Sequence, residues 1–267
     1  MSQYKVESIH YQHYEQNQFS KRETGIIVES PVSLTVNGEH WLTFMCTPTD
    51  LDAMVVGFLY NEGVIADFSE VENTRLCKHG DNVDVWLSHN ALKPDSWLRT
   101  SGCSGGLTSI IAEKEDHFQL HNNGATLSSE AIPRLLSELF STQELYRQSG
   151  GVHTSALSDG ERIVVMAEDI GRHNTLDKIA GLCLMEGVDL PHRILITTGR
   201  ISSEMLQKSA RLEASIVISR TSPSSLSVTL AKRWGITLIG YARRTSFRVY
   251  THTHRILNHA AIQQLAN

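Results

Sequence analysis

The chain has 267 residues, 40% hydrophobic and 20% charged, which is typical of a globular protein of one large or two small domains. Its formal net charge of −5 excludes a protein built to coat nucleic acid, so an anionic ligand must meet a local basic cluster. No stretch approaches the roughly 20 apolar residues of a membrane helix, and the polar N-terminus lacks a secretory apolar core, which predicts a cytoplasmic protein without membrane association.

The first part of the chain predicts a small β-rich unit with one helix. Residues 1–23 are expected to be a flexible lead-in. The segment VSLTVNGEHWLTFMC predicts a β-hairpin, because Asn37-Gly38 suits the left-handed positions of a type I′ turn. Thr49 or Asp50 is expected to cap a helix that has one apolar face and that Gly63 ends. Alternating apolar residues from Asp81 to Leu87 predict a strand.

The second part of the chain alternates between the two kinds of periodicity. A helix is expected after Ser128-Ser129-Glu130. Apolar runs predict strands at RIVVMA, RILITT, SIVIS and ITLIGY, and helical patterns lie between them at NTLDKIAGLCLMEG, SSEMLQKSARLEA and PSSLSVTLAKRWG. Strand, helix and strand in succession indicate βαβ units and a mainly parallel sheet covered by helices, hence an α/β fold (α+β overall).

In an open α/β sheet, ligands bind at the carboxyl ends of the parallel strands. This rule selects four loops, at 168–173, 198–203, 220–225 and 241–246. Each loop contains arginine, namely Arg172, Arg200, Arg220, and the pair Arg243 and Arg244. Three of them also open a helix, with Asn174, Ser202 and Ser222 as expected N-caps and Pro223 at a first helical position.

Helix N-termini and guanidinium groups both favour phosphate oxygens. Four such loops on one edge therefore predict an extended ligand with several phosphates, although any single arginine here could be a solvated surface residue. His153 and His173 are candidates for ligand contact or for ordinary structural histidines. Asp177 could complete a helix cap, while Glu168-Asp169 could bind a metal or a sugar hydroxyl, or be plain loop charges.

The four cysteines are scattered, with no CxxC pair and no zinc-finger spacing, which favours free thiols in a reducing cytoplasm. Cys46 and Cys183 lie within apolar patterns and are expected to be structural, and Cys77 is undetermined. Cys103 lies in the segment 94–106, PDSWLRTSGCSGG, which predicts an exposed flexible loop. A thiolate on such a loop suits covalent carriage of a group between partners, the alternative being an incidental surface cysteine.

These segments together resemble one protein family over about residues 25 to 257. The matching motifs are TPTDLDAMVVGFLYNEGVI, SGCSGG, GGVHTSAL, AEDIGRHNTLDKIAG, TTGRISSEMLQKSAR, SRTSPSSLSVTLAKRWGITLIGYARR and YTHTHRI. They are similar to the FdhD-type formate dehydrogenase accessory proteins. AEDIGRHNTLDKIAG and TTGRISSEM in this order carry most of the specificity.

The resemblance implies a sulfurtransferase. Such a protein accepts sulfur from a cysteine desulfurase as a persulfide on a loop cysteine, which matches Cys103. It passes the sulfur to a molybdenum or tungsten bis-guanine-dinucleotide cofactor that is destined for the formate dehydrogenase catalytic subunit. The stretch YARRTS, which is Tyr241, Ala242, Arg243, Arg244, Thr245 and Ser246, matches a cofactor-contacting loop, and the cofactor's two pyrophosphates suit Arg172, His173, Arg200, Ser202, Arg220 and Ser222.

The resemblance also implies an architecture. The family is dimeric, so a homodimer is expected. Residues 126–267 are expected to form a cytidine deaminase-like subdomain that binds the cofactor, and residues 24–125 an N-terminal subdomain that carries the cysteine loop.

Two departures from the expected motifs leave alternatives open. Many family members have CxxC in the loop, whereas Cys103 is followed by Ser104, Gly105 and Gly106, so a non-covalent cofactor chaperone is the alternative to sulfur transfer. Deaminases pair H-x-E with P-C-x-x-C to hold zinc, but Thr154 and Ser155 follow His153 and no P-C-x-x-C exists. No metal site and no catalytic zinc are therefore expected.

Overall fold

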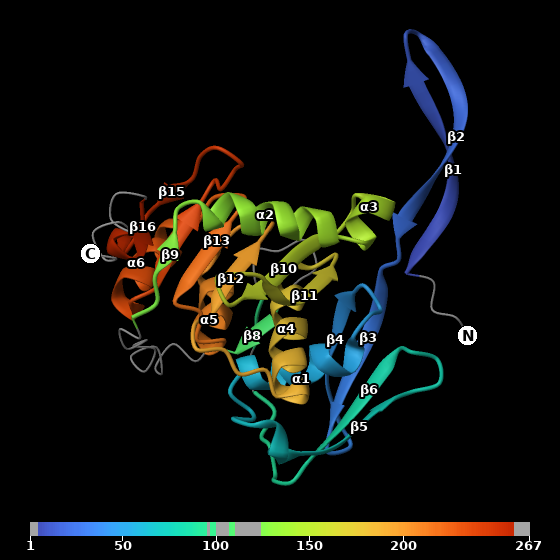
Figure 1. Cartoon of the computed structure of the whole chain (residues 1–267). Helices are drawn as coiled ribbons and strands as arrows, with labels where there is room; N and C mark the ends of the chain where they lie inside the picture. The colour runs from blue at the N-terminus through green and yellow to red at the C-terminus, as the bar shows by residue number, and fades with distance from the viewer. Residues whose placement is uncertain (1–4, 95–96, 100–106, 110–123, 259–267) are drawn as a thin grey trace.

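A computed structural model describes residues 5–94, 97–99, 107–109 and 124–258. This part of the chain has a mixed α/β fold in which six α-helices pack against several sheets (Figure 1). The two largest sheets belong to the two halves of the chain, and each is lined by its own cluster of buried apolar side chains. The predicted boundary between an N-terminal subdomain (residues 24–125) and a C-terminal subdomain (residues 126–267) stays a prediction.

The largest sheet has six strands in the order β11-β10-β12-β13-β14-β15. Its central strands β12 (Ile194–Thr197), β13 (Ile216–Ser219) and β14 (Thr237–Gly240) are parallel. Strand β10 (His153–Ser158) is antiparallel to both β11 (Ile163–Asp169) and β12, and β15 (Arg248–Val249) is antiparallel to β14. The prediction of a mainly parallel sheet was therefore wrong at both ends of this sheet.

Strand β10 was missed because its sequence, HTSALS, contains no apolar run. It is nevertheless almost fully buried, since its hydroxyl groups find partners inside the fold. The hydroxyl of Ser155 lies 2.7 Å from that of Thr175 and donates to that of Thr197 over 2.8 Å. Tertiary hydrogen bonds of this kind leave no signal in hydrophobic periodicity.

Helices cover both faces of the large sheet. Helices α4 (Arg172–Glu186), α5 (Ser203–Arg211) and α6 (Ser225–Trp234) share one apolar cluster with one face of the sheet. Helix α2 (Ala131–Thr142) packs on the opposite face and is followed by the short helix α3 (Leu145–Ser149) (Figure 1). Burial on both faces explains why the central strands are nearly all apolar, and these helices and strands confirm the elements predicted there.

The smaller, four-stranded sheet has the order β4-β3-β6-β5 and is covered by α1 (Leu51–Asn61). Its strands are β3 (Ser30–Val36), β4 (Glu39–Cys46), β5 (Val71–Leu76) and β6 (Asn82–Leu87). The predicted hairpin is confirmed, with Asn37 and Gly38 at φ of 48° and 84°. Asp50 precedes α1 in the left-handed region but makes no side-chain cap, and the helix is buried on all sides rather than on one face.

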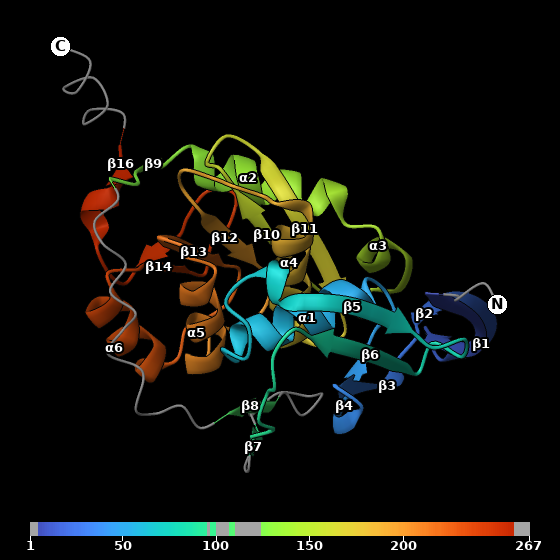
Figure 2. The same ribbon diagram turned by 90° about the horizontal axis from the view of Figure 1, so that it is seen from below.

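Helix α1 lies between the four-stranded sheet and α4 (Figure 2). Two glycines permit this close crossing. A Cβ atom at Gly57 would lie 1.8 Å from the carbonyl oxygen of Asp177, and one at Gly181 would lie 1.8 Å from that of Ala53. The two halves of the protein therefore meet backbone to backbone, which fixes α4 and the loop before it.

Smaller elements complete the described chain. They are the 3-10 helices η1 (Phe68–Glu70) and η3 (Thr253–Arg255), the antiparallel pair β7 (Trp97–Arg99) and β8 (Leu107–Ser109), and the parallel pair β9 (Leu127–Ser128) and β16 (Ile256–Leu257). Residues 97–99 of the predicted cysteine loop are thus in a strand. Over the described ranges, no helix combines the length and the apolar character needed to cross a membrane.

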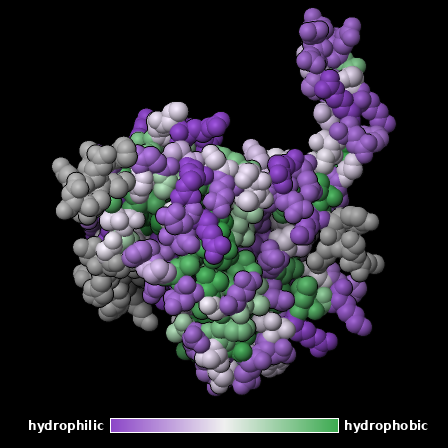
Figure 3. All heavy atoms as spheres, in the orientation of Figure 1, coloured by the Kyte–Doolittle hydropathy of each residue, from purple (hydrophilic) through white to green (hydrophobic). Residues whose placement is uncertain are grey.

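Residues 1–23 were predicted to be a flexible lead-in, and the structure describes most of this segment as β-strand. Strands β1 (Val6–Glu15) and β2 (Gln18–Ile27) form a long antiparallel hairpin that projects from the body of the molecule (Figure 1). This hairpin was not predicted from the sequence, because most of its side chains are exposed and polar (Figure 3). It therefore has no buried face that would produce the alternating apolar pattern of a strand.

Candidate functional site

Four strands of the large sheet end at one edge. Because β10 is antiparallel to both β11 and β12, strand β11 runs in the same direction as the parallel strands β12, β13 and β14. Their carboxyl ends therefore lie together, and the loops 168–173, 198–203, 220–225 and 241–246 follow directly. The predicted gathering of these loops on one edge is confirmed by the topology.

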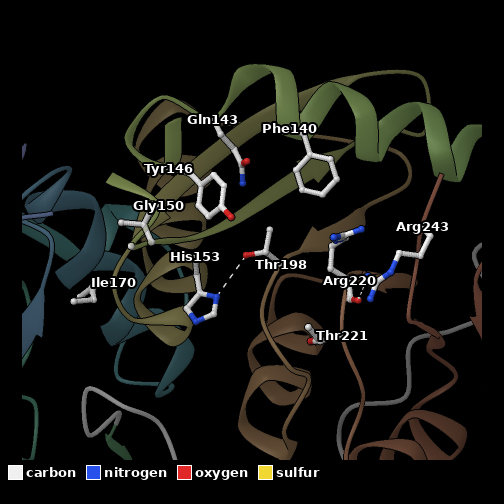
Figure 4. Close-up of a pocket in the computed structure, with 12 residues that line it drawn as sticks. Phe140, Gln143, Tyr146, Gly150, His153, Ile170, Thr198, Arg220, Thr221 and Arg243 are labelled. Carbon is white, nitrogen blue, oxygen red and sulfur yellow. Dashed lines mark hydrogen bonds between the residues drawn. The ribbon is translucent and has the colours of Figure 1, made fainter. Parts of the chain in front are cut away.

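A cavity of about 740 Å³ opens at this edge (Figure 4). Its roof comes from the end of α2 and from α3, which supply Phe140, Gln143 and Tyr146. Its other walls come from the segment before β10 and from the strand-end loops, which supply Gly150, Gly151, Val152, His153, Ile170, Thr198, Arg220, Thr221 and Arg243. Two of the predicted arginines, Arg220 and Arg243, thus line one cavity.

The two arginines of the cavity lie beside each other. The guanidinium of Arg243 donates to the carbonyl oxygen of Arg220 over 2.7 Å, and the backbone N–H of Arg243 donates to the carbonyl oxygen of Ser246 over 2.7 Å. The guanidinium of Arg220 lies over the Phe140 ring at 5.0 Å. Burial, and then the charge of Arg243, lowers the pKa of Arg220. An anionic ligand here would relieve the repulsion between two adjacent cations.

His153 offers a neutral donor to the same cavity. Burial, and then the charge of Arg172, lowers the pKa of His153 below its ordinary value, so the ring is neutral near pH 7. Its Nδ1 lies 3.5 Å from the hydroxyl of Thr198, which itself accepts the Thr154 backbone N–H over 3.0 Å. The Thr198 hydroxyl keeps one hydrogen and a second lone pair, so it can either donate to Nδ1 of His153 or accept from it.

The roof of the cavity is held in place by Glu168. Its carboxylate accepts the backbone N–H groups of Glu144, Leu145 and Tyr146, at distances of 2.9, 2.8 and 3.0 Å. The N–H groups at the start of a helix have no acceptor within the helix, and Glu168 supplies one for α3, the helix that carries Tyr146 into the cavity. Glu168 thus has a structural role and is not directed at a metal or a sugar.

Asp169 is likewise committed to the fold. It forms a fully buried ion pair with Lys178 at 2.7 Å and accepts N–H groups from Thr47, Gly171 and Asn174. Asn174 is therefore inside α4, whose N-cap is Gly171, and it does not cap the helix as predicted.

Asp177 does not cap α4 either. It is buried against the Lys208 ammonium at 2.5 Å, and Asn61 donates to it over 2.7 Å. Among the described residues, no three His, Cys, Asp or Glu side chains gather as metal ligands do.

His173 occupies the first turn of α4 and is nearly fully buried. Burial, and then the charge of Lys208, lowers its pKa to about 3. Its Nε2 has no hydrogen-bond partner among the described residues, and it does not line the cavity. Arg172, its neighbour, is also buried and acts on the cavity through its charge beside His153.

The remaining predicted ligand residues are distributed around the edge. Ser202 caps α5 as predicted, whereas α6 is capped by Ser224 and not by Ser222, and Pro223 precedes that cap. Arg200 is exposed, and its charge is close enough to His153 to lower the pKa of that histidine.

In the segment 241–246 only Arg243 lines the cavity. The Tyr241 ring stacks on Arg248 at 4.3 Å, and the side chain of Ala242 is buried in the core. Arg244, Thr245 and Ser246 are exposed on the surface.

The roof residues Phe140, Gln143 and Tyr146 were not predicted as site residues. They lie in a helical region that reads as ordinary amphipathic helix, and only the tertiary fold places its end above the sheet edge. One feature of the sequence could have indicated this side of the cavity, the pair Gly150-Gly151 before His153. Paired glycines allow a chain to pass close to a ligand.

Cys103 lies outside the described residues, so its role stays a prediction. Cys46 and Cys183 are buried, which raises the pKa of their thiols to about 12 and about 11 and keeps them protonated, in agreement with a structural role. Cys77 is half-buried and donates to the Asp81 carboxylate over 2.8 Å.

Comparisons with known proteins agree with one another. The sequence profile of the FdhD/NarQ family matches residues 27–257. The chain is 36% identical to the sulfur carrier protein FdhD of Bacillus subtilis, over 91% of this chain and 94% of the relative, and 32% identical to that of Staphylococcus haemolyticus over the same shares. A solved structure from Desulfotalea psychrophila, assigned as a formate dehydrogenase accessory protein, superposes with a TM-score of 0.79 at 27% identity, over 94% of this chain and 99% of the other.

Proposed function

The chain belongs to the FdhD/NarQ family, and from this premise we propose that it is a sulfur carrier that serves formate dehydrogenase. The named function of the relatives supports the sulfur chemistry, and the name of the similar structure supports the formate dehydrogenase connection. The partners in this proposal are a cysteine desulfurase as donor and the formate dehydrogenase catalytic subunit as final recipient, in the cytoplasm.

In this proposal Cys103 carries the sulfur. Its thiolate attacks the terminal sulfur of a persulfide on the desulfurase, which forms Cys103 persulfide and releases the desulfurase thiolate without net oxidation. Release of the carried atom as sulfide requires two electrons, which two external thiol groups provide by joining in a disulfide. The three other cysteines do not suit this role, because two are buried and the third donates to a carboxylate.

The acceptor of the sulfur is proposed to be a molybdenum or tungsten bis-guanine-dinucleotide cofactor, held as a transferred ligand. The observation that supports this most is the cavity at the strand ends, where Arg220 and Arg243 lie side by side and Phe140 and Tyr146 offer aromatic surface. Guanidinium groups suit pyrophosphate, and rings suit a flat base. Residues 126–267 are proposed to keep a deaminase-like fold without its zinc chemistry.

The alternative is a cofactor chaperone without covalent chemistry. Gly106 stands where many relatives have a second cysteine, and this observation favours the alternative. Both functions use the cavity, but only the carrier uses Cys103.

Intact-mass spectrometry after incubation with a cysteine desulfurase and cysteine separates the two functions. The wild type should gain sulfur that a thiol reductant removes, Cys103→Ala should gain none, and the matched control Cys77→Ala should behave as the wild type. Equal gain in the wild type and Cys103→Ala would refute Cys103 as the carrier. If the wild type gains no sulfur but still binds nucleotide, the chain is better described as a cofactor chaperone without covalent chemistry.

Calorimetric binding of GDP tests the cavity independently. Arg243→Ala should weaken GDP binding by about tenfold or more, since a charge-assisted bond to phosphate contributes roughly 1.5–3 kcal/mol. Arg162→Ala is the matched control, because Arg162 is exposed just before β11, at the other end of the strands. Equal affinity in wild type and Arg243→Ala would show that the ligand binds elsewhere.

A further inference from the structure

Gln143, the residue that follows α2, is buried in the roof of the cavity, and only 2% of it is exposed. Its side chain lies between the rings of Phe140 and Tyr146, with the amide directed into the cavity (Figure 4). A primary amide carries a donor on one side and an acceptor on the other, so its orientation decides what it offers to a ligand.

A chain of polar groups behind Gln143 fixes the orientation of this amide. The hydroxyl of Thr154 lies 2.6 Å from Nε2 of Gln143 and 3.5 Å from Oε1 of Glu168. Glu168 is in turn fixed by the backbone N–H groups at the start of α3. A carboxylate only accepts, so the single hydrogen of the Thr154 hydroxyl goes to Glu168, and the hydroxyl accepts from Nε2 of Gln143.

The other atom of the amide is therefore the one that Gln143 offers to a ligand. With Nε2 held by Thr154, Oε1 is left as an acceptor, and among the described residues no donor reaches it. A hydrogen-bond acceptor in a nearly buried wall favours a ligand that brings an N–H or O–H group to it.

The groups around Oε1 define the shape of that ligand. The rings of Phe140 and Tyr146 flank Gln143, which suits a flat heterocycle whose edge meets the amide (Figure 4). Arg220 lies over the Phe140 ring at 5.0 Å, with Arg243 beside it, so phosphates at these arginines would continue from the heterocycle. A cavity of about 740 Å³ has room for one nucleoside diphosphate.

A fixed acceptor distinguishes between the two purine bases. Guanine carries a hydrogen on N1, whereas adenine carries a lone pair there, and proteins read a base by such groups on its edge. Oε1 of Gln143 would accept the N1–H of guanine but would meet the lone pair of adenine, which leaves both acceptors unpaired. A site built to bond one ligand rejects the analogue that cannot make the bond. The reverse orientation of the amide would favour adenine.

We propose that Gln143 is the residue by which this cavity selects guanine over adenine. The N1–H of guanine donates to Oε1 of Gln143 while the base lies between Phe140 and Tyr146. Thr154 and Glu168 are positioning residues that keep Nε2 turned away from the base. This role rests on the proposed function, in which the cavity takes a guanine-dinucleotide cofactor, and it assigns the choice of base to one side chain.

Calorimetric titration of the full chain with GDP and with ADP tests this role. The wild type should bind GDP about tenfold or more tightly than ADP. Gln143→Met keeps the length of the side chain but removes the amide, so its affinity for GDP should fall to that for ADP. Its affinity for ADP should change little, which also reports that the variant is folded. Gln148→Met, at an exposed position of α3, is the matched control and should keep the preference for GDP.

The outcomes separate this role from the proposed function. Equal affinity of the wild type for GDP and ADP, with both weakened in Arg243→Ala, would refute selection of the base but leave the phosphate-binding cavity intact. A preference for GDP that survives in Gln143→Met would show that another group reads the base. Loss of both nucleotides in Gln143→Met would show a structural role only. If the wild type bound neither nucleotide, this role and the proposed cofactor would both be refuted.

Inosine diphosphate (IDP) tests which atom of the base is read. Its base keeps the N1–H of guanine but lacks the 2-amino group. The affinity of the wild type for IDP should therefore be closer to that for GDP than to that for ADP, and Gln143→Met should bind IDP and ADP equally. If the wild type bound IDP as weakly as ADP, a contact between Oε1 of Gln143 and N1–H would be overturned.

Discussion

His173 shows how a single residue near the site is tuned by its surroundings. It is nearly fully buried among positive charges, and Lys208, Arg172 and His153 all act against its protonation. The folded protein therefore holds it neutral, with a pKa of about 3, whereas the unfolded chain takes up a proton near the ordinary value of 6.5. This difference makes stability depend on pH, because the unfolded state binds more protons below pH 6.5.

The sign of this dependence gives a prediction. The free energy of unfolding should fall as the pH drops below about 6.5, by up to about 1.4 kcal/mol per pH unit from this group. Urea unfolding at pH 7 and pH 5 should show that the wild type loses about 2 kcal/mol more than His173→Gln. The exposed His79 provides the control, since His79→Gln should keep the wild-type loss. Equal losses in the wild type and His173→Gln would contradict a buried neutral His173.

At the scale of elements, the crossing of α1 and α4 depends on two glycines inside helices, where glycine is intrinsically unfavourable. The close approach places Asp177, Lys178 and Asn61 in one buried layer, with Lys208 of α5 beside them. It also fixes the start of α4, and thereby the loop from Glu168 to His173 that borders the cavity.

Gly181→Ala should therefore destabilise the protein, although alanine is the better helix former by about 1 kcal/mol. The added methyl group would overlap the Ala53 carbonyl, and overpacking of this kind costs roughly 1–3 kcal/mol or more. Thermal and urea unfolding measure the loss, with Lys232→Ala on the exposed face of α6 as a control expected within about 0.5 kcal/mol. An unchanged unfolding midpoint for Gly181→Ala would show that α1 and α4 are farther apart than the structure places them.

At the scale of the whole molecule, buried polar contacts join the two halves. Asp169 of the C-terminal half pairs with Lys178 and accepts the backbone N–H of Thr47 from the N-terminal half. The Lys178 ammonium in turn donates to the Thr47 carbonyl and the Thr49 hydroxyl, at 3.1 and 2.8 Å. The halves should therefore unfold together, although each has its own sheet.

Calorimetry of Asp169→Asn tests this coupling. The substitution leaves the Lys178 ammonium buried without its counter-ion, which typically costs about 3–5 kcal/mol. The melting temperature should fall by about 6–12 °C or more, and both proteins should melt in a single transition. Arg162→Ala, which removes only a surface ion pair, should melt close to the wild type. Two separate transitions in the wild type would show that the halves are independent.

The sequence alone predicted the parts of this protein that local chemistry controls. The turn at Asn37-Gly38, the central apolar strands, the helices around them and the arginine loops on one edge were all predicted, because periodicity and turn residues report local preference. The resemblance through AEDIGRHNTLDKIAG and TTGRISSEM identified the family that the comparisons confirm.

Only the tertiary structure decided which polar residues serve the site and which serve the fold. Glu168, Asp169, Asn174 and Asp177 read as loop or cap residues, yet each is satisfied by a partner far away in the sequence or on another element. Arg220 and Arg243 became neighbours, while Arg244 remained at the surface, and the roof came from the end of α2 and from α3, in a region that the sequence marks only as amphipathic helix. The physical reason is that burial and hydrogen-bond partners belong to the assembled molecule, whereas a sequence shows only what each residue could offer.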